Sequence, residues 1–224
     1  WSDILLRYIV VGLGNSVTAS QYNYDSAWTP ASLSNLTLWL AFNQNITADQ
    51  NAANATVDHS TTAGNMADGD KPLWETDAAD IGGIKLHDSI KFMDLSANIV
   101  LDANTDFTIA LRFKCTDFSA TRGLMGSAGT EFIRLTDNNS LRMRINNTPR
   151  DFDLASGTIA TDEYFTLMIV RSDGSTGNLN VFIRGDESLN GTATGTQVGS
   201  EIADANEITI SDIGAQSDDS TNFY

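Results

Sequence analysis

Apolar and polar residues alternate along much of this chain, which is the pattern of strands with one buried face. Residues 105–113 place Phe107, Ile109, Leu111 and Phe113 on the same side of such a strand. The alternation recurs at residues 132–135 and 141–145, and further strand-like segments follow at residues 164–170, 178–185 and 207–214. No window shows the sustained three-and-four spacing of a helix. The pattern therefore predicts an all-β protein with antiparallel sheets.

Polar turns separate several of these segments. Residues 137–140, Asp-Asn-Asn-Ser, lie between two alternating segments and predict a hairpin. Residues 84–86 and 90–92 also alternate, around His87-Asp88-Ser89, and predict a second, tight hairpin. A third turn is expected within residues 171–177, which contain Asp, Ser and Gly.

The N-terminal segment, residues 4–11, is a nearly continuous apolar run that must be shielded from solvent by other residues. Two arrangements remain open: the run completes the sheet of its own domain, or it is an arm that packs on a neighbouring subunit. We assign subunit contact to its apolar residues, which are Ile4, Leu5, Leu6, Tyr8, Ile9, Val10 and Val11.

One phrase resembles a known family. Trp28-Thr-Pro30, Leu33, Asn35-Leu36 and Trp39-Leu40 are similar to the opening strand of concanavalin A-like (laminin-G-like) domains in marine bacteriophage structural proteins. The order of the later strands resembles the same family. The resemblance implies an antiparallel two-sheet jelly-roll sandwich over residues 29–224, preceded by an N-terminal arm or extra strand at residues 1–28. The family's final strand is expected to be missing, since the sequence stops at residues 222–224, where that strand normally begins.

Charge narrows the possible partners. The net charge is −16, from 13 Lys and Arg against 29 Asp and Glu. Nucleic-acid binding requires a basic surface, so we expect no nucleic-acid partner. No stretch approaches 18 apolar residues, so we expect no membrane span. The single cysteine, Cys115, excludes an internal disulfide and is expected to be a small half-buried apolar residue.

Aromatic residues in loop-like segments are candidate platforms for sugar rings. These residues are Tyr22, Tyr24, Trp28 and Trp74. The long segment 43–70 is rich in amide and carboxylate groups and is a candidate binding loop. Because the chain is strongly acidic, we expect any glycan ligand to be neutral, or to be bridged by a divalent cation.

Enzymatic and metal sites have weaker signals. Glu75 and Asp80 are similarly placed to the two carboxylates of laminarinase-type glycoside hydrolases, whose retaining mechanism needs a separation of about 5 Å. The second carboxylate is Asp where that family has Glu, so we expect no enzyme and keep the pair as a weak alternative. Asp68 and Asp70, or the acidic residues 212–219, are candidate calcium ligands. Apart from possible calcium, no cofactor is expected.

These observations favour a non-enzymatic binding protein. The resemblance implies a structural subunit on a virion surface, either a capsid decoration or an appendage, whose partners are itself or other virion subunits. The alternative is a lectin-like glycan-binding module of a secreted or cell-surface protein. A laminarinase-type hydrolase is the third possibility.

Overall fold

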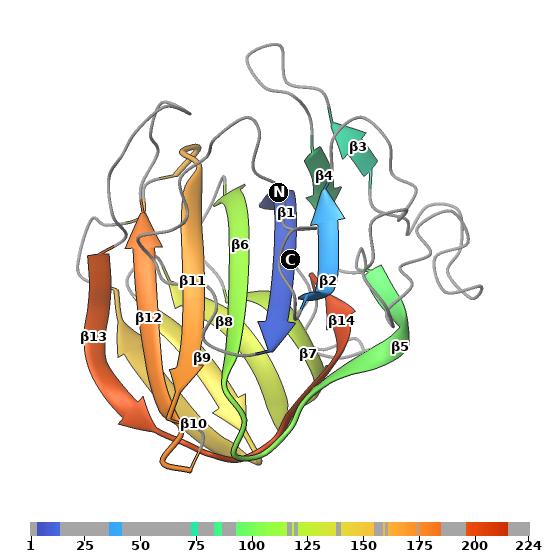
Figure 1. Cartoon of the computed structure of the whole chain (residues 1–224). Coiled ribbons are helices and arrows are strands. Elements are labelled where there is room, and N and C mark those ends of the chain that lie inside the picture. The colour runs from blue at the N-terminus through green and yellow to red at the C-terminus, as the bar shows by residue number, and fades with distance from the viewer. Residues whose placement is uncertain are drawn as a thin grey trace.

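The computed structural model shows a β-sandwich of two antiparallel sheets (Figure 1). It describes residues 4–13, 36–41, 73–75, 83–86, 93–115, 118, 121–137, 140–154, 159, 161–173, 175–184 and 196–214. Within these residues there is no helix, and the predicted all-β antiparallel class is confirmed. The strands are β1 (Ile4–Leu13), β2 (Leu36–Ala41), β3 (Leu73–Glu75), β4 (Gly83–Leu86), β5 (Met93–Leu101), β6 (Phe107–Cys115), β7 (Arg122–Ala128), β8 (Glu131–Asp137), β9 (Ser140–Ile145), β10 (Thr148–Asp153), β11 (Phe165–Ser172), β12 (Asn178–Arg184), β13 (Thr196–Ala203) and β14 (Ile208–Ile213).

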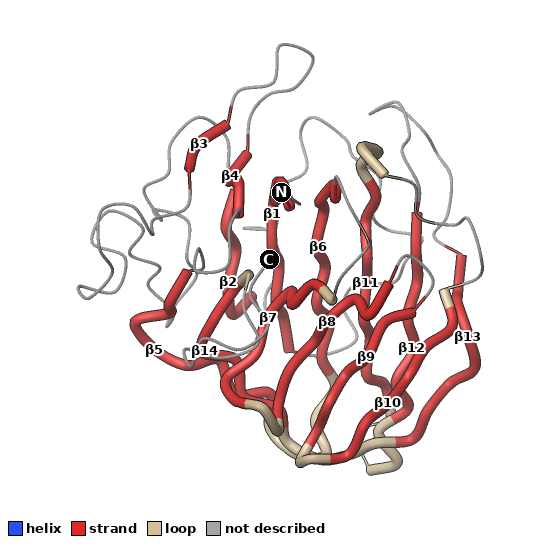
Figure 2. The backbone as a smooth tube through the Cα atoms, turned by 180° about the vertical axis from the view of Figure 1, so that it is seen from behind, coloured by secondary structure: helices blue, strands red, loops and turns tan. Residues whose placement is uncertain are grey.

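The two sheets differ in size and in where their strands come from. The eight-stranded sheet has the order β13-β12-β11-β6-β1-β4-β3, with β2 also paired to β1. The six-stranded sheet has the order β10-β9-β8-β7-β14-β5. The chain passes between the sheets after β4, β5, β6, β10 and β13 (Figure 2). Each sheet therefore contains strands that are far apart in the sequence.

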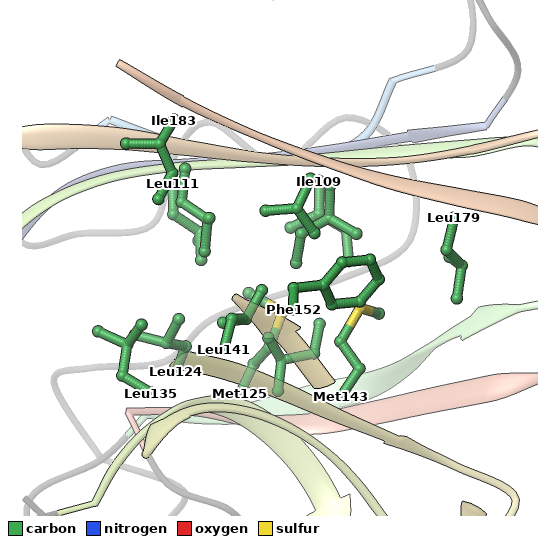
Figure 3. Packing of buried hydrophobic residues seen from close by; sticks show 14 of the residues in the cluster. Ile109, Leu111, Leu124, Met125, Leu135, Leu141, Met143, Phe152, Leu179 and Ile183 are labelled. Carbon is green, nitrogen blue, oxygen red and sulfur yellow. The ribbon is translucent and has the colours of Figure 1, made fainter. Parts of the chain in front are cut away.

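The core lies between the two sheets and consists of the inward positions of each strand. The predicted inward face of β6 is confirmed, because Phe107, Ile109, Leu111 and Phe113 are at most 1% exposed. Figure 3 shows Ile109 and Leu111 facing residues of the other sheet across the core. Burying large aliphatic and aromatic side chains contributes about 1.5–3 kcal/mol each, so this face adds substantially to the stability of the core.

One predicted hairpin is confirmed. β8 and β9 pair antiparallel with Asp137 opposite Ser140, as the polar turn at residues 137–140 indicates. Of the hairpin expected between residues 84–86 and 90–92, the second segment lies outside the described residues, and the first pairs with other strands. Ile84 of β4 pairs with Leu6 on one side and with Trp74 on the other, and the next strand, β5, belongs to the six-stranded sheet. One edge of β4 is therefore paired with β1 and the other with β3.

Three turns meet at one end of the sandwich, the lower end in Figure 1. They are the β5–β6 crossing at residues 102–106, the β11–β12 turn at residues 173–177 and the β13–β14 crossing at residues 204–207. Backbone hydrogen bonds join them: the Asn104 amide donates to the carbonyl of Ala205 (2.9 Å), and the Asp204 amide donates to the carbonyl of Gly177 (2.8 Å). Gly177 has a φ of +68°, which a residue with a side chain rarely adopts.

Candidate functional site

A buried arginine links two of these turns, and we call the arrangement the turn clamp. Arg171, near the end of β11, is 0% exposed because it faces the core, as do its register partners Phe107 and Leu179. Its Nε donates to the carbonyl of Thr105 at 2.7 Å, and its Nη atoms donate to the carbonyls of Asn206 and Asp102. The guanidinium also lies 4.6 Å from the centroid of the Phe107 ring. The hydrogen bonds to Thr105 and Asp102 hold the β5–β6 crossing, and the hydrogen bond to Asn206 holds the β13–β14 crossing.

Asp204 extends the clamp to the six-stranded sheet. Its side chain is fully buried, and Arg150 of β10 donates from Nε to Oδ2 at 2.8 Å. Oδ1 accepts hydrogen bonds from the backbone and side-chain amides of Asn206, at 3.0 and 2.8 Å. Burial by itself raises the pKa of Asp204, but the hydrogen bonds from Asn206 and Arg150 outweigh burial, and the pKa lies below its ordinary value. Asp204 therefore stays ionised.

The turn clamp has charged groups but lacks access to a substrate. Burial lowers the pKa of Arg171, partly offset by the charges of Asp204, Asp106 and Asp102. The acceptors of its guanidinium are three main-chain carbonyls and one hydroxyl of the same chain. Such saturated, buried contacts stabilise the fold. We therefore assign the clamp a structural role.

A second polar group lies on the outer face of the eight-stranded sheet, and we call it the amide row. Gln197 of β13 donates from Nε2 to Oδ1 of Asn180 at 2.8 Å, and Asn180 donates from Nδ2 to Oε2 of Glu201 at 3.0 Å. Phe182, the register partner of Gln197, is half-buried beside them. An aromatic ring next to exposed amide and carboxylate groups has the components that bind sugar rings and their hydroxyl groups.

Further along the same sheet, two basic side chains flank a tyrosine. Arg112 and Lys114 each lie 5.3 Å from the centroid of the Tyr164 ring. Arg112 also donates to the hydroxyl of Thr166 at 3.4 Å. Tyr164 is only 7% exposed, so its ring is a support for the two cations and is not open to stack on a ligand.

Six of the eight residues predicted for catalysis, glycan binding or metal binding lie outside the described residues. These are Tyr22, Tyr24, Trp28, Asp68, Asp70 and Asp80. Trp74 and Glu75 lie in β3, at the edge of the eight-stranded sheet, where the backbone pairs them with Ile84 and Gly83. Because Asp80 lies outside the described residues, its pairing with Glu75 stays a prediction, and so do the catalytic and glycan-binding roles.

All of the predicted subunit-contact residues lie in β1; they are Ile4, Leu5, Leu6, Tyr8, Ile9, Val10 and Val11. This strand pairs with β6 on one side and with β4 and β2 on the other. The pairing corresponds to the first of the two arrangements left open by the sequence, in which the segment completes its own sheet. Contact with a second subunit stays a prediction.

Metal and thiol chemistry have limited support in the described part of the chain. No group of three or more His, Cys, Asp or Glu side chains is placed to hold a metal ion among those residues. Asp212 of β14 is 1% exposed and accepts a hydrogen bond from Ser211 at 2.5 Å. Cys115 is 0% exposed and so more deeply buried than expected. Within the described segments, no helix has the length and apolar character needed to cross a bilayer.

Sequence reasoning missed the amide row. Asn180 and Phe182 alternate with the apolar residues Leu179, Val181 and Ile183, so the period-two pattern already placed them on the outer face. The pairing of β12 with β13, which brings Gln197 and Glu201 beside them, had no signal in the sequence.

Comparison with known proteins adds no relatives. No family model, curated protein or solved structure matches this chain.

Proposed function

We propose that the chain is a non-enzymatic structural subunit of a virion surface, either a capsid decoration or an appendage. It acts through contacts between the sheets of neighbouring subunits. In this proposal the sandwich is a concanavalin A-like jelly roll. Its support is the phrase Trp28-Thr-Pro30 to Trp39-Leu40, together with the two antiparallel sheets. An extracellular location is the alternative for the same kind of module.

One observation carries the proposal: the six-stranded sheet ends in a long edge strand. β5 has nine residues, and among the described strands it pairs only with β14. Val100 on this strand is 42% exposed, the one large apolar side chain among the described residues with such exposure. A strand edge of this length is a template to which a strand of another chain can add.

The test is the oligomeric state of the protein and of a β5 variant. Sedimentation velocity over a range of concentrations should show association of the wild-type chain. Val100→Lys puts a charge on the edge strand and should weaken that association about tenfold or more. Thr148→Lys adds the same charge to β10, the opposite edge of the sheet, and serves as the control. A chain that stays monomeric at all concentrations, or equal effects of the two variants, would contradict the proposal.

The amide row favours glycan binding as a second candidate function. Amide groups both donate and accept hydrogen bonds, which suits the hydroxyl groups of a neutral sugar. A glycan array read with and without calcium tests it, with Asn180→Ala as the variant that removes the centre of the row. Binding of neutral glycans that persists in Asn180→Ala would exclude this site.

A further inference from the structure

The hydrogen bonds of the amide row have a direction, which the carboxylate of Glu201 sets. A carboxylate only accepts hydrogen bonds, so the atom of Asn180 that lies 3.0 Å from Oε2 of Glu201 is the Nδ2 donor. Oδ1 of Asn180 then faces Gln197, whose Nε2 donates to it at 2.8 Å. The three side chains form one chain of hydrogen bonds that runs from Gln197 to Glu201, and this chain fixes how both amide groups are turned.

A bulge in β13 brings these side chains together at one edge of the eight-stranded sheet (Figure 1). The register of β12 with β13 shifts there, so residues 199–201 lie opposite Asn180 alone. Gly199 in the bulge has a φ of +68°. The extra residues allow Gln197 and Glu201 to reach Asn180 from either side, and both of these side chains are exposed.

The groups that the row leaves open are mostly acceptors. Within the described part of the chain, Oε1 of Glu201 and Oε1 of Gln197 receive no hydrogen bond, whereas Oε2 of Glu201 and Oδ1 of Asn180 each receive one. Since each oxygen accepts two hydrogen bonds, about six acceptor sites remain, against one N–H on each amide. A ligand that satisfies the row must therefore bring more donors than acceptors.

An aromatic ring lies beside these acceptors. Phe182 is the register partner of Gln197, is half-buried, and is the next outward residue of β12 after Asn180. The face of such a ring packs against the apolar face of a sugar ring and also attracts a cation through its quadrupole. A ligand with both a ring and a positive charge can use the two properties together.

The charges closest to the row are negative. Asp106 precedes β6 and Asp173 follows β11, at the same end of the sheet as Glu201. Two arginines at this end are already engaged: Arg171 is fully buried, and Arg150 donates to a buried carboxylate. Among the described residues, this end of the sheet therefore presents carboxylates and no unpaired basic group to a ligand.

The basic residues on the outer face of the same sheet lie further away. Arg112 of β6 and Arg184 of β12 are both register partners of Thr166, and Arg184 is four residues along its strand from Asn180. Lys114 lies two residues beyond Arg112. Four residues of a strand span about 13 Å, which exceeds the Debye length of about 8 Å at physiological ionic strength. The row is therefore screened from these charges.

We propose that the amide row binds amino sugars, with the protonated amine at the open oxygen of Glu201 and the sugar ring against Phe182. An ammonium group supplies three donors and no acceptor, which complements the open oxygens of the row. Its charge is attracted by Glu201 and by the net charge of −16 of the chain. The inference rests on the glycan-binding function proposed for the row and is independent of the subunit contacts at β5. It departs from the expectation of neutral glycans, which considered the repulsion of anions but not the attraction of cations.

The experiment uses one sugar backbone in two charge states. Binding of the full chain to tetraglucosamine and to tetra-N-acetylglucosamine is measured by calorimetry in chelator, at a pH below the pKa of the sugar amine. We expect tetraglucosamine to bind about tenfold more tightly or better. Glu201→Gln keeps the shape of the row but removes its charge, and should abolish most of this difference. Glu163→Gln removes the same charge at the opposite end of the sheet and should change affinity less than about twofold.

A second variant tests the contact with the sugar ring. Phe182→Leu keeps an apolar side chain but removes the aromatic face, and should weaken tetraglucosamine binding about threefold or more. Equal weakening by Glu201→Gln and Glu163→Gln would overturn the proposal, because general attraction to an acidic protein would then explain the binding. Pentalysine that binds more tightly than tetraglucosamine would make the row a site for basic peptides instead.

The outcomes also separate this inference from the glycan-binding function on which it rests. Equal affinity for the two sugars, lowered alike by Asn180→Ala, would leave the glycan site in place and overturn only the preference for amino sugars. Absence of binding to both sugars and to every glycan of the array would overturn both.

Discussion

Arg171 and Arg142 are the same kind of residue in two places of the sandwich. Arg171 is buried in the eight-stranded sheet, whereas Arg142 lies on the surface of the six-stranded sheet, where its Nε donates to Oδ1 of Asp151 at 2.6 Å. Arg171 occupies an inward position, with Phe107 and Leu179 as register partners, and is completely buried. Arg134 and Arg142 occupy outward positions with each other as partners. The parity of a residue along its strand therefore decides whether a guanidinium points into the core or toward the solvent.

The two arginines also differ in how far water can replace their hydrogen bonds. The hydrogen bonds of Arg171 are part-buried and its own side chain has no exposed surface, so losing the arginine removes donors that water replaces only in part. The Arg142–Asp151 pair is more than one third exposed, and water can solvate both groups when the pair is broken. Similar hydrogen bonds therefore contribute very differently to stability, and the following variants are chosen to test that difference.

The largest expected effect is at Arg171. Arg171→Met keeps a long side chain but removes the guanidinium donors of the Thr105 and Asn206 carbonyls and one of the two donors of the Asp102 carbonyl. It should destabilise the protein by about 3–5 kcal/mol. Arg142→Met, its counterpart at the surface, should cost less than about 1 kcal/mol. Urea unfolding followed by circular dichroism measures both. Equal losses in the two variants would show that burial does not separate these arginines.

The next effect is at two glycines that have the same φ of +68° in different surroundings. A Cβ on Gly177 would lie 2.3 Å from the carbonyl oxygen of Asp204, whereas on Gly199 it would lie 3.4 Å from the amide nitrogen of Asp153. Gly177→Ala should therefore cost about 2–4 kcal/mol and Gly199→Ala about 1–2 kcal/mol. Thermal melting of the two variants checks the order, and a smaller loss for Gly177→Ala would place the tight contact elsewhere.

The smallest effect depends on pH. Because the folded-state pKa of Asp204 is lowered, its contribution to stability is present above the unfolded pKa of about 3.9 and is lost as the pH falls through the folded value. Asp204→Asn should cost about 1–3 kcal/mol at pH 7 and make acid unfolding less steep. Asp151→Asn should leave the acid transition nearly unchanged, since that carboxylate is half-exposed. Urea midpoints between pH 2 and pH 7 provide the measurement; parallel profiles for wild type and Asp204→Asn would contradict it.

The sequence predicted strands better than it predicted partners. Phe107, Ile109, Leu111 and Phe113 were identified as one buried face because a period of two is a local property of the chain. Pairing is not local: Ile84 was expected opposite residues 90–92, yet its partners are Leu6 and Trp74. The hydrophobic pattern shows which face of a strand is buried but does not show which strand lies next to it.

The same distinction between local pattern and strand pairing decides which polar groups could be foreseen from the sequence. Arg134, Arg142 and Arg144 are each visible in the sequence as polar residues at alternating positions. Their common face follows from the β8–β9 hairpin, which the turn at residues 137–140 had already indicated. The turn clamp had no such signal, because an arginine after the apolar run of β11 resembles an ordinary strand end.

The turn clamp also has a consequence for the order in which the protein assembles. Arg171 reaches acceptors 66 and 69 residues before it, at Thr105 and Asp102, and another 35 residues after it, at Asn206. Contacts over such distances close large loops and slow the search for the native state. A chain emerging from the ribosome lacks the last acceptor until residue 206 has been made. The guanidinium can therefore join the β5–β6 crossing to the β13–β14 crossing only after residue 206 has been made.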